Sequence, residues 1–274
     1  MVPPWVIIGC GYTGTRLARV VVGTGADVTV TRRDGAAADA KAAELGARGA
    51  RADFDDPPSW RGLVRDGAVV ACLAPPGRDP AAGMRSLIAA AERASRFIYV
   101  SSTGVYAPGG GQWVDEQWQI APATPSGRAR VACETVVAEA ALSTVILRAA
   151  GIYGPGRGLA ERIAAGSYRI VGDGRSHVSR IHVDDLVEAM IRAATASVTG
   201  AINIADDDPA PIGEVADAIA TSLGRPPPPR VAPDTVAPEI AGMLTADRKI
   251  ANQRMKQALG LRLRYPSWRS ALAR

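Results

Sequence analysis

The chain has 274 residues, of which 47% are hydrophobic and 22% charged, and its formal net charge is +5. This size suits one globular, enzyme-sized unit, and no apolar run approaches the roughly 18–20 residues of a membrane-spanning helix. The basic residues are spread along the chain without a nucleic-acid motif. The charge therefore favours a small anionic ligand over nucleic acid or a membrane surface as the partner.

A glycine-rich turn follows the first predicted strand. The apolar run Trp5–Ile8 is typical of a buried parallel strand, and the sequence continues as G-x-G-x-x-G. Gly9 permits a tight turn, Gly11 lets the backbone approach a pyrophosphate, and Gly14 lets helix and strand pack closely. A phosphate then binds the N–H groups at the start of the next helix. We predict a dinucleotide site, with a purely structural glycine turn as the alternative, formed in this loop by Gly9, Gly11, Tyr12, Thr13 and Gly14.

The next two elements lead to the residues that read the ribose. A helix is expected over residues 15–22, with Leu17, Val20 and Val21 pointing inward. The alternating sequence at 26–31 predicts the second strand. The end of this strand lies about twenty residues past the glycine loop, where the ribose-reading residue of such folds stands.

Two arginines occupy this ribose-reading position. An NAD-preferring site places a carboxylate there, which accepts a hydrogen bond from the 2′-hydroxyl. This chain instead has Arg32 and Arg33, followed by Asp34. Two guanidinium groups suit a 2′-phosphate, because the planar fork makes charge-assisted bidentate contacts. We predict that NADP(H) is favoured over NAD(H); a solvated basic turn, or an Asp34 that turns back to the ribose, remains the alternative.

Strands and helices continue to alternate further along the chain. More strands are expected at 47–52, 69–73, 97–101 and 145–148, and helices at 36–45, 81–95 and 127–142. This alternation predicts an α/β fold of Rossmann type, with a doubly wound parallel sheet, helices on both faces and the ligand across the carboxyl ends of the strands. The proline tract Pro226–Pro229 is expected to form an exposed connector.

The three cysteines indicate a reducing compartment. Cys10, Cys72 and Cys133 are far apart, odd in number and each in an apolar setting. They predict buried, reduced thiols rather than a disulfide framework or a zinc site, and we expect no metal. Because the first predicted strand begins almost at Met1, no secretory signal is expected either. A cytoplasmic location follows from these features.

Three further motifs resemble those of a known superfamily. After the glycine loop come Ser101–Tyr106 (SSTGVY), Leu147–Arg157 (LRAAGIYGPGR) and Arg180–Leu186 (RIHVDDL). Their order and spacing resemble those of the extended short-chain dehydrogenase/reductases. The chain resembles the NAD-dependent epimerase/dehydratase group of that superfamily from end to end, including the tail at 249–272.

The resemblance implies how the chain is divided and which residues hold the cofactor. A Rossmann domain is expected at 1–150 plus 178–204, and a smaller, mainly C-terminal substrate lobe at 151–177 plus 205–274. In this family the residues after the third strand surround the adenine. The residues that end the fourth strand lie beside the nicotinamide ribose and the pyrophosphate. The corresponding cofactor residues, with the end of the fifth predicted strand added, are Asp53, Phe54, Ala74, Pro75 and Ser101.

The catalytic pair is the point at which this chain departs from the family pattern. The family uses a Tyr and a Lys one helical turn apart, with a Ser or Thr near a strand end. Here the three positions hold Ser126, Arg130 and Thr103, and Thr124–Pro125 supports the register because it caps the helix. A serine hydroxyl is far too weak an acid to replace a phenol, whereas Arg130 can still donate to ribose hydroxyls. The departure resembles the atypical YeeZ-like branch, whose members lack the usual pair.

Other residues are candidates for the missing acid. Thr103 matches the carbonyl-orienting hydroxyl, and Tyr106 is the nearest phenol, which a cation such as Arg130 can tune. Thr103, Tyr106 and Arg130 are therefore the candidate catalytic residues, although Tyr106 alternatively forms a wall on the substrate side. The loop pair Asp115–Glu116 offers a carboxylate base or a solvated loop face. The resemblance implies these substrate-binding residues: Tyr106, Tyr153, Arg157, Arg180 and His182. The alternatives are a structural Tyr153, a satisfied buried histidine at 182 and plain surface arginines at 157 and 180.

Two classes of function follow. The first is an NAD(P)-dependent oxidoreductase or epimerase that transfers hydride between a nicotinamide cofactor, NADP favoured, and a carbonyl or alcohol carbon of a small or nucleotide-sugar-like substrate. The second is a non-catalytic NADP(H)-binding sensor or regulatory protein on the same fold. The motifs from Thr103 to Arg180 favour the enzyme, whereas Ser126 and Arg130 favour the sensor. The expected partner is a small-molecule substrate, and a homodimer is the candidate assembly.

Overall fold

The computed structural model describes residues 2–272 and folds them into two compact units. Unit 1 comprises the residues up to Ser101, Ala129–Leu147 and Val187–Ile202. Unit 2 comprises Ser102–Arg128, Arg148–Leu186 and the residues from Asn203 onward. Each unit therefore contains segments from several parts of the chain.

The unit boundaries differ from the predicted domain limits. The structure assigns four segments of the predicted Rossmann domain to unit 2: 102–128, 148–150, 178–186 and 203–204. For the first segment the reason is a long-range contact, since Arg248 donates hydrogen bonds to the carbonyls of Thr103 and Tyr106. Because these partners lie far apart along the chain, no local sequence pattern indicates the boundary.

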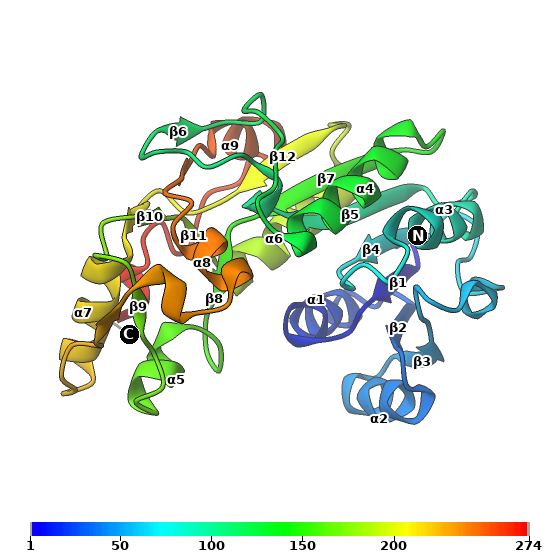
Figure 1. Ribbon diagram of the computed structural model, residues 1–274. Coiled ribbons are helices and arrows are strands. Elements are labelled where there is room, and N and C mark those ends of the chain that lie inside the picture. Colours follow the sequence, from blue (N-terminus) through cyan, green and yellow to red (C-terminus); the bar gives the residue numbers. More distant parts are fainter. Residues whose placement is uncertain (1, 273–274) are drawn as a thin grey trace. The chain divides into compact units, whose positions relative to one another are not determined.

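Unit 1 is built around a seven-stranded sheet (Figure 1), in the order β12-β7-β5-β4-β1-β2-β3. The strands are β1 (Trp5–Ile8), β2 (Val28–Arg32), β3 (Arg48–Arg51), β4 (Val69–Cys72), β5 (Arg96–Ser102), β7 (Thr144–Ala149) and β12 (Ala201–Ile204). β1 pairs in parallel with both β2 and β4, and the strand order reverses between β1 and β4. A doubly wound sheet binds its ligand at the carboxyl ends of the strands at such a reversal. The predicted Rossmann-type fold is confirmed.

Helices cover both faces of this sheet in unit 1. The helices that alternate with the strands of this sheet are α1 (Tyr12–Gly23), α2 (Gly35–Leu45), α3 (Pro80–Ala90), α4 (Pro125–Glu139) and α6 (Val183–Thr195). Successive strand residues face opposite ways, so β1 presents Ile8 to one face and Ile7 to the other. Ile8 belongs to a buried cluster with Met84 of α3 and Cys133 of α4. Ile7 lies against Gly14 of α1, which places that helix on the opposite face.

Two details of the helices differ from the predictions. Leu17 and Val21 of α1 are buried as expected, but Val20 is 46% exposed. Leu17 and Val21 lie one turn apart on the same face of the helix, and Val20 falls outside that stripe. Helix α3 ends at Ala90 rather than at the predicted Ser95. The chain turns there, and the N–H of Ser95 bonds back to the segment that precedes β4.

Unit 2 is built from short elements around its own apolar cluster. Its elements are β6 (Trp113–Val114), β8 (Gly151–Tyr153), α5 (Leu159–Ala164), β9 (Ile170–Val171), β10 (His177–Val178), β11 (Arg180–His182), β13 (Ala210–Pro211), α7 (Ile212–Ser222), β14 (Arg230–Val231), α8 (Pro238–Leu244), β15 (Lys249–Ile250), α9 (Gln253–Leu259) and α10 (Arg269–Leu272). Tyr168, Ile170, Ile212 and Trp268 are buried together in this cluster. The proline tract at 226–229 lies outside any helix or strand, and three of its four prolines are exposed, as expected for a connector.

Cys10, Cys72 and Cys133 are free and buried, as predicted. Burial raises the pKa of all three thiols, that of Cys133 to about 11, which keeps them protonated at neutral pH. None of the helices formed by residues 2–272 combines the length and the apolar character needed to cross a membrane.

Candidate functional site

The glycine loop packs tightly at two of its glycines and stays open at the third. Gly9 has a φ of +89°, and a Cβ there would lie 2.7 Å from the backbone N of Ala74. A Cβ on Gly14 would lie 2.6 Å from the carbonyl O of Gly9, whereas a Cβ on Gly11 would meet no described atom within 4 Å. The tight turn at Gly9 and the close packing at Gly14 are therefore confirmed. Gly11 leaves space beside the loop, and its approach to a pyrophosphate stays a prediction.

The end of β2 holds this loop in place. Thr31 accepts two hydrogen bonds from it, one from the N–H of Gly9 to Oγ1 (3.2 Å) and one from the N–H of Cys10 to the carbonyl (2.9 Å). Arg32 Nε donates to the carbonyl O of Cys10 at 3.1 Å. Gly11 is the N-cap of α1, and no side chain in the described part of the molecule caps this helix. Because the first N–H groups of a helix lack intrahelical partners, this helix start suits an anionic ligand.

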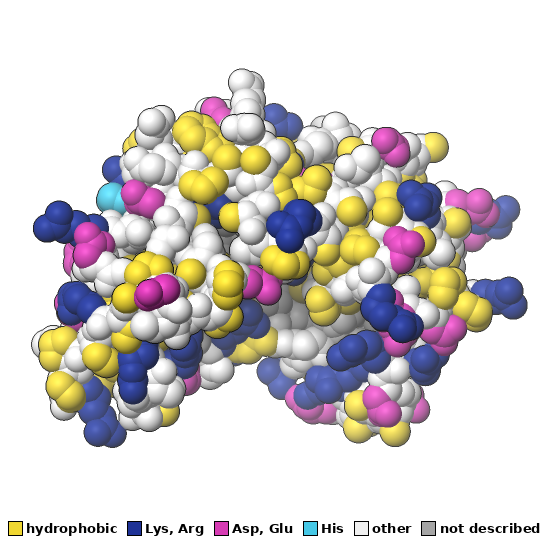
Figure 2. Space-filling model, viewed as in Figure 1, with side chains coloured by type: hydrophobic (Ala, Val, Ile, Leu, Met, Phe, Trp, Pro, Cys, Tyr) yellow, Lys and Arg dark blue, Asp and Glu magenta, His cyan; other side chains and the backbone are white. Residues whose placement is uncertain are grey.

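The carboxylate beside the two arginines is already engaged. Asp34 is the N-cap of α2, and its Oδ1 accepts a hydrogen bond from the N–H of Ala37 at 2.7 Å. Arg32 is half-buried at the end of β2, whereas Arg33 is exposed. Lys and Arg side chains gather over β2 and β3 of unit 1 in Figure 2. An Asp34 that turned back to a ribose would leave α2 without its cap, at a cost of about 1 kcal/mol.

On the side where the adenine is expected, Asp53 and Phe54 differ in accessibility. Asp53 is half-buried, and its Oδ1 accepts a hydrogen bond from the N–H of Asp55 at 3.0 Å. Phe54 is only 6% exposed and packs edge-on against Trp60, with ring centroids 5.4 Å apart. The ring of Phe54 belongs to the core, and a contact of this residue with an adenine stays a prediction. Asp53 stays a predicted contact.

A buried hydroxyl and an arginine meet the carboxyl edge of the sheet in unit 1. Ala74 and the exposed Pro75 follow β4. Ser101 is buried in β5, and its Oγ has no hydrogen-bond partner among residues 2–272. Arg130 reaches the end of the same strand from α4, since its Nη1 donates to the carbonyl O of Val100 at 3.1 Å. A buried polar atom without a partner is uncommon, and both groups lie at the edge where a doubly wound sheet binds its ligand.

In unit 2, helix α4 begins beside the turn that follows β5. The hydroxyl of Thr124 accepts a hydrogen bond from the N–H of Gly127 at 3.0 Å, which confirms the predicted cap. A Cβ on Gly127 would lie 2.6 Å from the carbonyl O of Gly104, so the helix start packs directly on the turn. Ser126, which the resemblance predicts at the position of the family's Tyr, is exposed.

Two hydroxyl groups follow one another in this turn. Thr103 begins the short helical turn Thr103–Val105 and is half-buried. Ser102 is also half-buried, and its Oγ accepts a hydrogen bond from the N–H of Gly104 at 3.0 Å. The sequence prediction named Thr103 alone, although the run of adjacent hydroxyl residues was the signal for both. Ser102 is therefore an additional candidate for orienting a substrate.

Tyr106 lies inside unit 2 rather than at its surface. Its side chain is 0% exposed, and its hydroxyl donates to Asn203 Oδ1 at 2.7 Å and accepts from Arg148 Nη1 at 2.9 Å. Asn203 is held in turn by Glu116, which accepts its backbone N–H at 2.8 Å. A buried phenol with two partners does not meet a substrate. This corrects the prediction that Tyr106 donates a proton or forms a substrate-side wall, and Glu116 has a structural contact instead of a catalytic one.

The other predicted substrate residues are divided between the surface and the interior. Arg157 is exposed, whereas His182 is 2% exposed. His182 Nδ1 accepts a hydrogen bond from the N–H of Asp184 at 3.2 Å, and its ring stacks on Tyr265 with centroids 3.6 Å apart. Tyr153 meets the same imidazole edge-on at 5.2 Å. His182 is therefore a core residue of unit 2, which agrees with the alternative of a satisfied buried histidine rather than with substrate binding.

Arg180 lies in a buried cluster of polar groups. Arg180 is 8% exposed and Asp206 is 1% exposed. Burial lowers the pKa of Arg180 and raises the pKa of Asp206 to about 8. Within residues 2–272, Asp206 Oδ2 and the hydroxyls of Tyr153 and Tyr168 have no hydrogen-bond partner. An arginine enclosed in this way is not placed to contact a substrate, which corrects the prediction that Arg180 binds the substrate.

The raised pKa of Asp206 makes stability depend on pH. Its carboxyl ionises near pH 4 in the unfolded chain but only near pH 8 in the folded one, so this group's contribution to stability is lost as pH rises from about 4 to 8. We expect Asp206→Asn to raise the free energy of unfolding by about 1–3 kcal/mol at pH 9 and by much less at pH 5. Thermal unfolding of both proteins at the two pH values measures this. An equal gain at pH 5 and pH 9 would contradict it.

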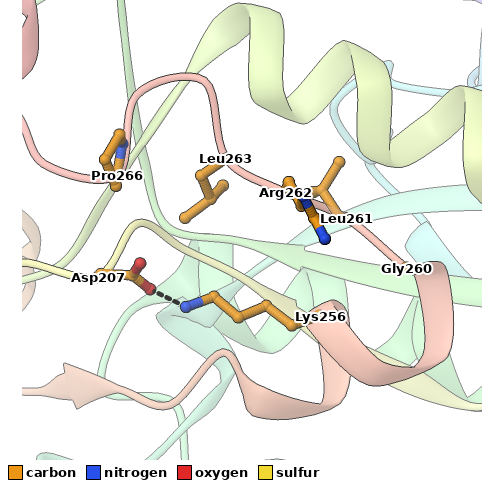
Figure 3. Close-up of a pocket in the computed structure, with 7 residues that line it drawn as sticks. All are labelled: Asp207, Lys256, Gly260, Leu261, Arg262, Leu263 and Pro266. Atoms are coloured by element: carbon orange, nitrogen blue, oxygen red, sulfur yellow. Dashed lines mark hydrogen bonds and ion pairs between the residues drawn. The ribbon is translucent and has the colours of Figure 1, made fainter.

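A separate hollow lies on unit 2, with a volume of about 570 Å³. Figure 3 shows that Lys256 reaches across it to Asp207, and the Lys256 Nζ and Asp207 Oδ1 atoms are 2.5 Å apart. Its lining residues are Asp207, Lys256, Gly260, Leu261, Arg262, Leu263 and Pro266. None of these is a predicted site residue, and the ion pair already satisfies the two charges that face each other in the hollow.

The geometry of unit 1 defines a class of protein. A parallel sheet whose first strand leads through G-x-G-x-x-G to a helix start, at the reversal of strand order, is the dinucleotide-binding fold. The model of the "NAD dependent epimerase/dehydratase family" matches residues 5–205, and the chain belongs to that family. Its cofactor is accordingly a nicotinamide dinucleotide, NAD or NADP.

Known relatives agree with this assignment. The chain is 34% identical over 211 residues to a 3-diazoavenalumate denitrifying reductase from Streptomyces sp., a match that covers 70% of this chain and 69% of the relative. A conserved protein of unknown function from Silicibacter pomeroyi superposes with a TM-score of 0.84 at 28% identity, covering 99% of this chain and 97% of the other. UDP-glucose 4-epimerase from Thermotoga maritima shares the fold, with a TM-score of 0.82 at 20% identity and coverage of 98% and 96%.

Proposed function

We propose that the protein is an NADP(H)-dependent reductase that delivers hydride to a small molecule. The end of β2 carries this proposal: Arg32 and Arg33 stand where the cofactor's ribose is read, while Asp34 is engaged as the N-cap of α2. A 2′-phosphate gains charge-assisted contacts at such a site, and a 2′-hydroxyl finds no available carboxylate at Asp34. The reductase named among its relatives supports the direction of the reaction.

The other residues of unit 1 fit this cofactor. The open side of Gly11 and the start of α1 suit the pyrophosphate, and Asp53 stands on the adenine side. Ser101 and Arg130 at the end of β5 suit the hydroxyls of the nicotinamide ribose, since one is an unpaired buried hydroxyl and the other a cation. When bound, NADPH supplies the hydride, and these residues hold and orient the cofactor.

The proposed substrate class rests on two candidates for a proton donor, Ser126 and Tyr106. Ser126 replaces the family's phenol, and the hydroxyl of Tyr106 is buried with two partners. A carbonyl needs a proton on its oxygen as hydride reaches its carbon, and a serine hydroxyl is too weak an acid to supply it. The chain therefore suits an acceptor that takes hydride without a proton.

A diazonium group is such an acceptor, and the name of the Streptomyces relative includes a diazo compound and the loss of nitrogen. In this reaction the carbon–nitrogen bond breaks and its electron pair leaves on N2. Hydride brings the electron pair of the new carbon–hydrogen bond. Cofactor and substrate thus give R–H, N2 and NADP⁺ with no proton transferred. We assign a compound that carries a diazonium group as the substrate class.

The proposal is tested by following NADPH oxidation and N2 release with an aryl diazonium salt, and with aldehydes as the comparison. We expect enzyme-dependent oxidation with equal release of N2, and deuterium from C4-deuterated NADPH in the product. Reactions without enzyme and with Gly11→Val, which blocks the cofactor site, are the controls. Turnover of aldehydes alone would contradict the substrate class. NADPH binding without turnover of the diazonium salt or the aldehydes would favour the alternative function, a non-catalytic NADP(H) sensor. Ser126 and the buried Tyr106 are also consistent with a sensor.

Ser126 is not expected to act as the general acid. Its hydroxyl is exposed and contributes at most positioning, so Ser126→Ala should keep kcat within a few-fold of the wild type. Steady-state kinetics with the diazonium salt measure this. A fall of about 10² or more, the low end for the loss of a general acid, would show that Ser126 transfers a proton. In the converse variant, Ser126→Tyr with Arg130→Lys, the appearance of aldehyde reduction would show that the missing phenol decides the substrate class.

A further inference from the structure

We infer that Arg248 is a positioning residue for the reaction, because it fixes the shape of the turn that follows β5. The inference rests on the proposed reductase function, since a turn that orients a substrate matters only if substrate is turned over. Three backbone carbonyls accept hydrogen bonds from this one side chain. Nη1 donates to Thr103 (3.2 Å), Nη2 to Tyr106 (2.6 Å) and Nε to Ala107 (2.9 Å).

Only a guanidinium group makes this set of contacts. Its donors lie in one plane in a fixed fork, so they can meet three carbonyls that are spread over five consecutive residues, 103–107. A lysine ammonium is a point charge on a flexible chain and cannot reach all three in that arrangement. The side chain is half-buried, and burial lowers the pKa of Arg248, but an arginine remains protonated at any pH at which the protein is folded.

The segment that carries Arg248 is itself held firmly. Asp247 adopts a φ of +47°, a conformation that is uncommon for a residue other than glycine. Its Oδ1 accepts the backbone N–H of His177 at 2.7 Å, and its carbonyl accepts the N–H of Gly111 at 2.9 Å. A Cβ on Gly109 would lie 2.6 Å from the same carbonyl, so the loop and this segment are in close contact. Arg248 therefore projects from a fixed backbone.

The turn that Arg248 holds carries the hydroxyls expected to face the substrate. Ser102 and Thr103 stand at its start, and the carbonyl of Gly104 packs against Gly127 at the beginning of α4. A shift of this turn moves both hydroxyls together with the helix start. Since misplacement of a reacting group by about 1 Å can cost up to 10² in rate, a loosened turn lowers kcat even though Arg248 touches no substrate.

Arg96 provides a matched control at the other end of β5. It is buried in unit 1 and also donates to three acceptors: the Ala193 carbonyl (2.9 Å), Ser143 Oγ (2.7 Å) and the Val198 carbonyl. Arg96→Lys therefore removes the same kind of contact from a place that carries none of the proposed site hydroxyls. We expect it to lower the melting temperature and to leave kcat per folded molecule unchanged.

The test compares Arg248→Lys with Arg96→Lys. For Arg248→Lys we expect kcat with the diazonium salt to fall about tenfold, NADPH affinity to stay within twofold of the wild type, and hydrogen exchange to speed up at residues 103–109. Unchanged kcat, or exchange at 103–109 that matches the Arg96→Lys variant, would overturn the inference. If Arg248→Lys does not fold, Asp247→Gly takes its place: glycine accepts the φ of +47° but loses the bond to His177, and a smaller fall in kcat is expected.

The two proposals fail in different ways. If the wild type turns over no diazonium salt or aldehyde, the proposed function is wrong, and hydrogen exchange at residues 103–109 still decides whether Arg248 fixes the turn. If the wild type turns over substrate but kcat is the same in Arg248→Lys, the function stands and Arg248 has only a structural role.

Discussion

Gly11→Val is expected to weaken NADPH binding by at least about 100-fold while the protein remains folded. Gly11 lies outside the left-handed region, with a φ of −92° and a ψ of −147°, and a Cβ there would meet no described atom within 4 Å. The fold therefore loses little, about 1 kcal/mol for a poorer N-cap. The added side chain instead fills the space through which a pyrophosphate would approach the start of α1, and a 100-fold change corresponds to about 2.7 kcal/mol.

Gly23→Val is the matched control for this variant. Gly23 ends the same helix, and a Cβ there would also meet no described atom within 4 Å. The two variants should therefore unfold at similar temperatures, while only Gly11→Val loses NADPH. Titration with NADPH followed by its fluorescence gives both dissociation constants. NADPH affinity that is the same in both variants would show that no cofactor passes Gly11.

The double variant Arg32→Ala/Arg33→Ala is expected to bind NADPH at least about 100-fold more weakly and to bind NADH almost as well as the wild type. Each lost charge-assisted contact to a 2′-phosphate costs about 1.5–3 kcal/mol, and NADH has no such phosphate. The preference for NADPH should therefore disappear. Arg19→Ala removes a charge of the same sign from the exposed side of α1, where Arg19 pairs with Glu44, and should change neither affinity.

NADH also controls for damage to the loop. Arg32 donates to the carbonyl of Cys10 as well as facing the expected phosphate, so its removal could loosen the glycine loop itself. Loosening would weaken NADH and NADPH equally, whereas loss of a phosphate contact weakens NADPH alone. Equal losses for both cofactors would contradict the assignment of Arg32 and Arg33 to the 2′-phosphate.

The parts of the fold that depend on neighbouring residues could be predicted from the sequence. The apolar run Trp5–Ile8 forms β1 with the predicted limits, and the glycines after it form the expected turn, because backbone conformation and burial there are set by adjacent residues. The cap of α4 by Thr124 was visible for the same reason. Helix ends were predicted less well than helix positions. Helix α3 ends at Ala90 because the chain turns back toward the sheet there, and the alanine-rich sequence of the helix does not indicate this turn.

The errors at the site come from contacts between distant residues. Tyr106 was predicted to face a substrate from its place after β5, but Arg148 and Asn203 bind its hydroxyl from far along the chain. His182 is likewise enclosed by Tyr265. The sequence did not indicate Arg248, because its hydrogen-bond partners are backbone carbonyls, which every residue type has. Burial and partner choice of this kind depend on tertiary packing, so residue type and spacing alone cannot reveal them.

Calorimetric titration of the wild-type protein with NADPH and, separately, with NADH tests the central claim most directly. Unit 1 presents a glycine loop open at Gly11, two arginines at the end of β2 and an Asp34 engaged as a helix cap. These features predict that one NADPH binds per chain, with a dissociation constant at least about tenfold lower than that of NADH, which corresponds to about 1.4 kcal/mol. Equal affinities for the two cofactors, or binding of neither, would contradict the account.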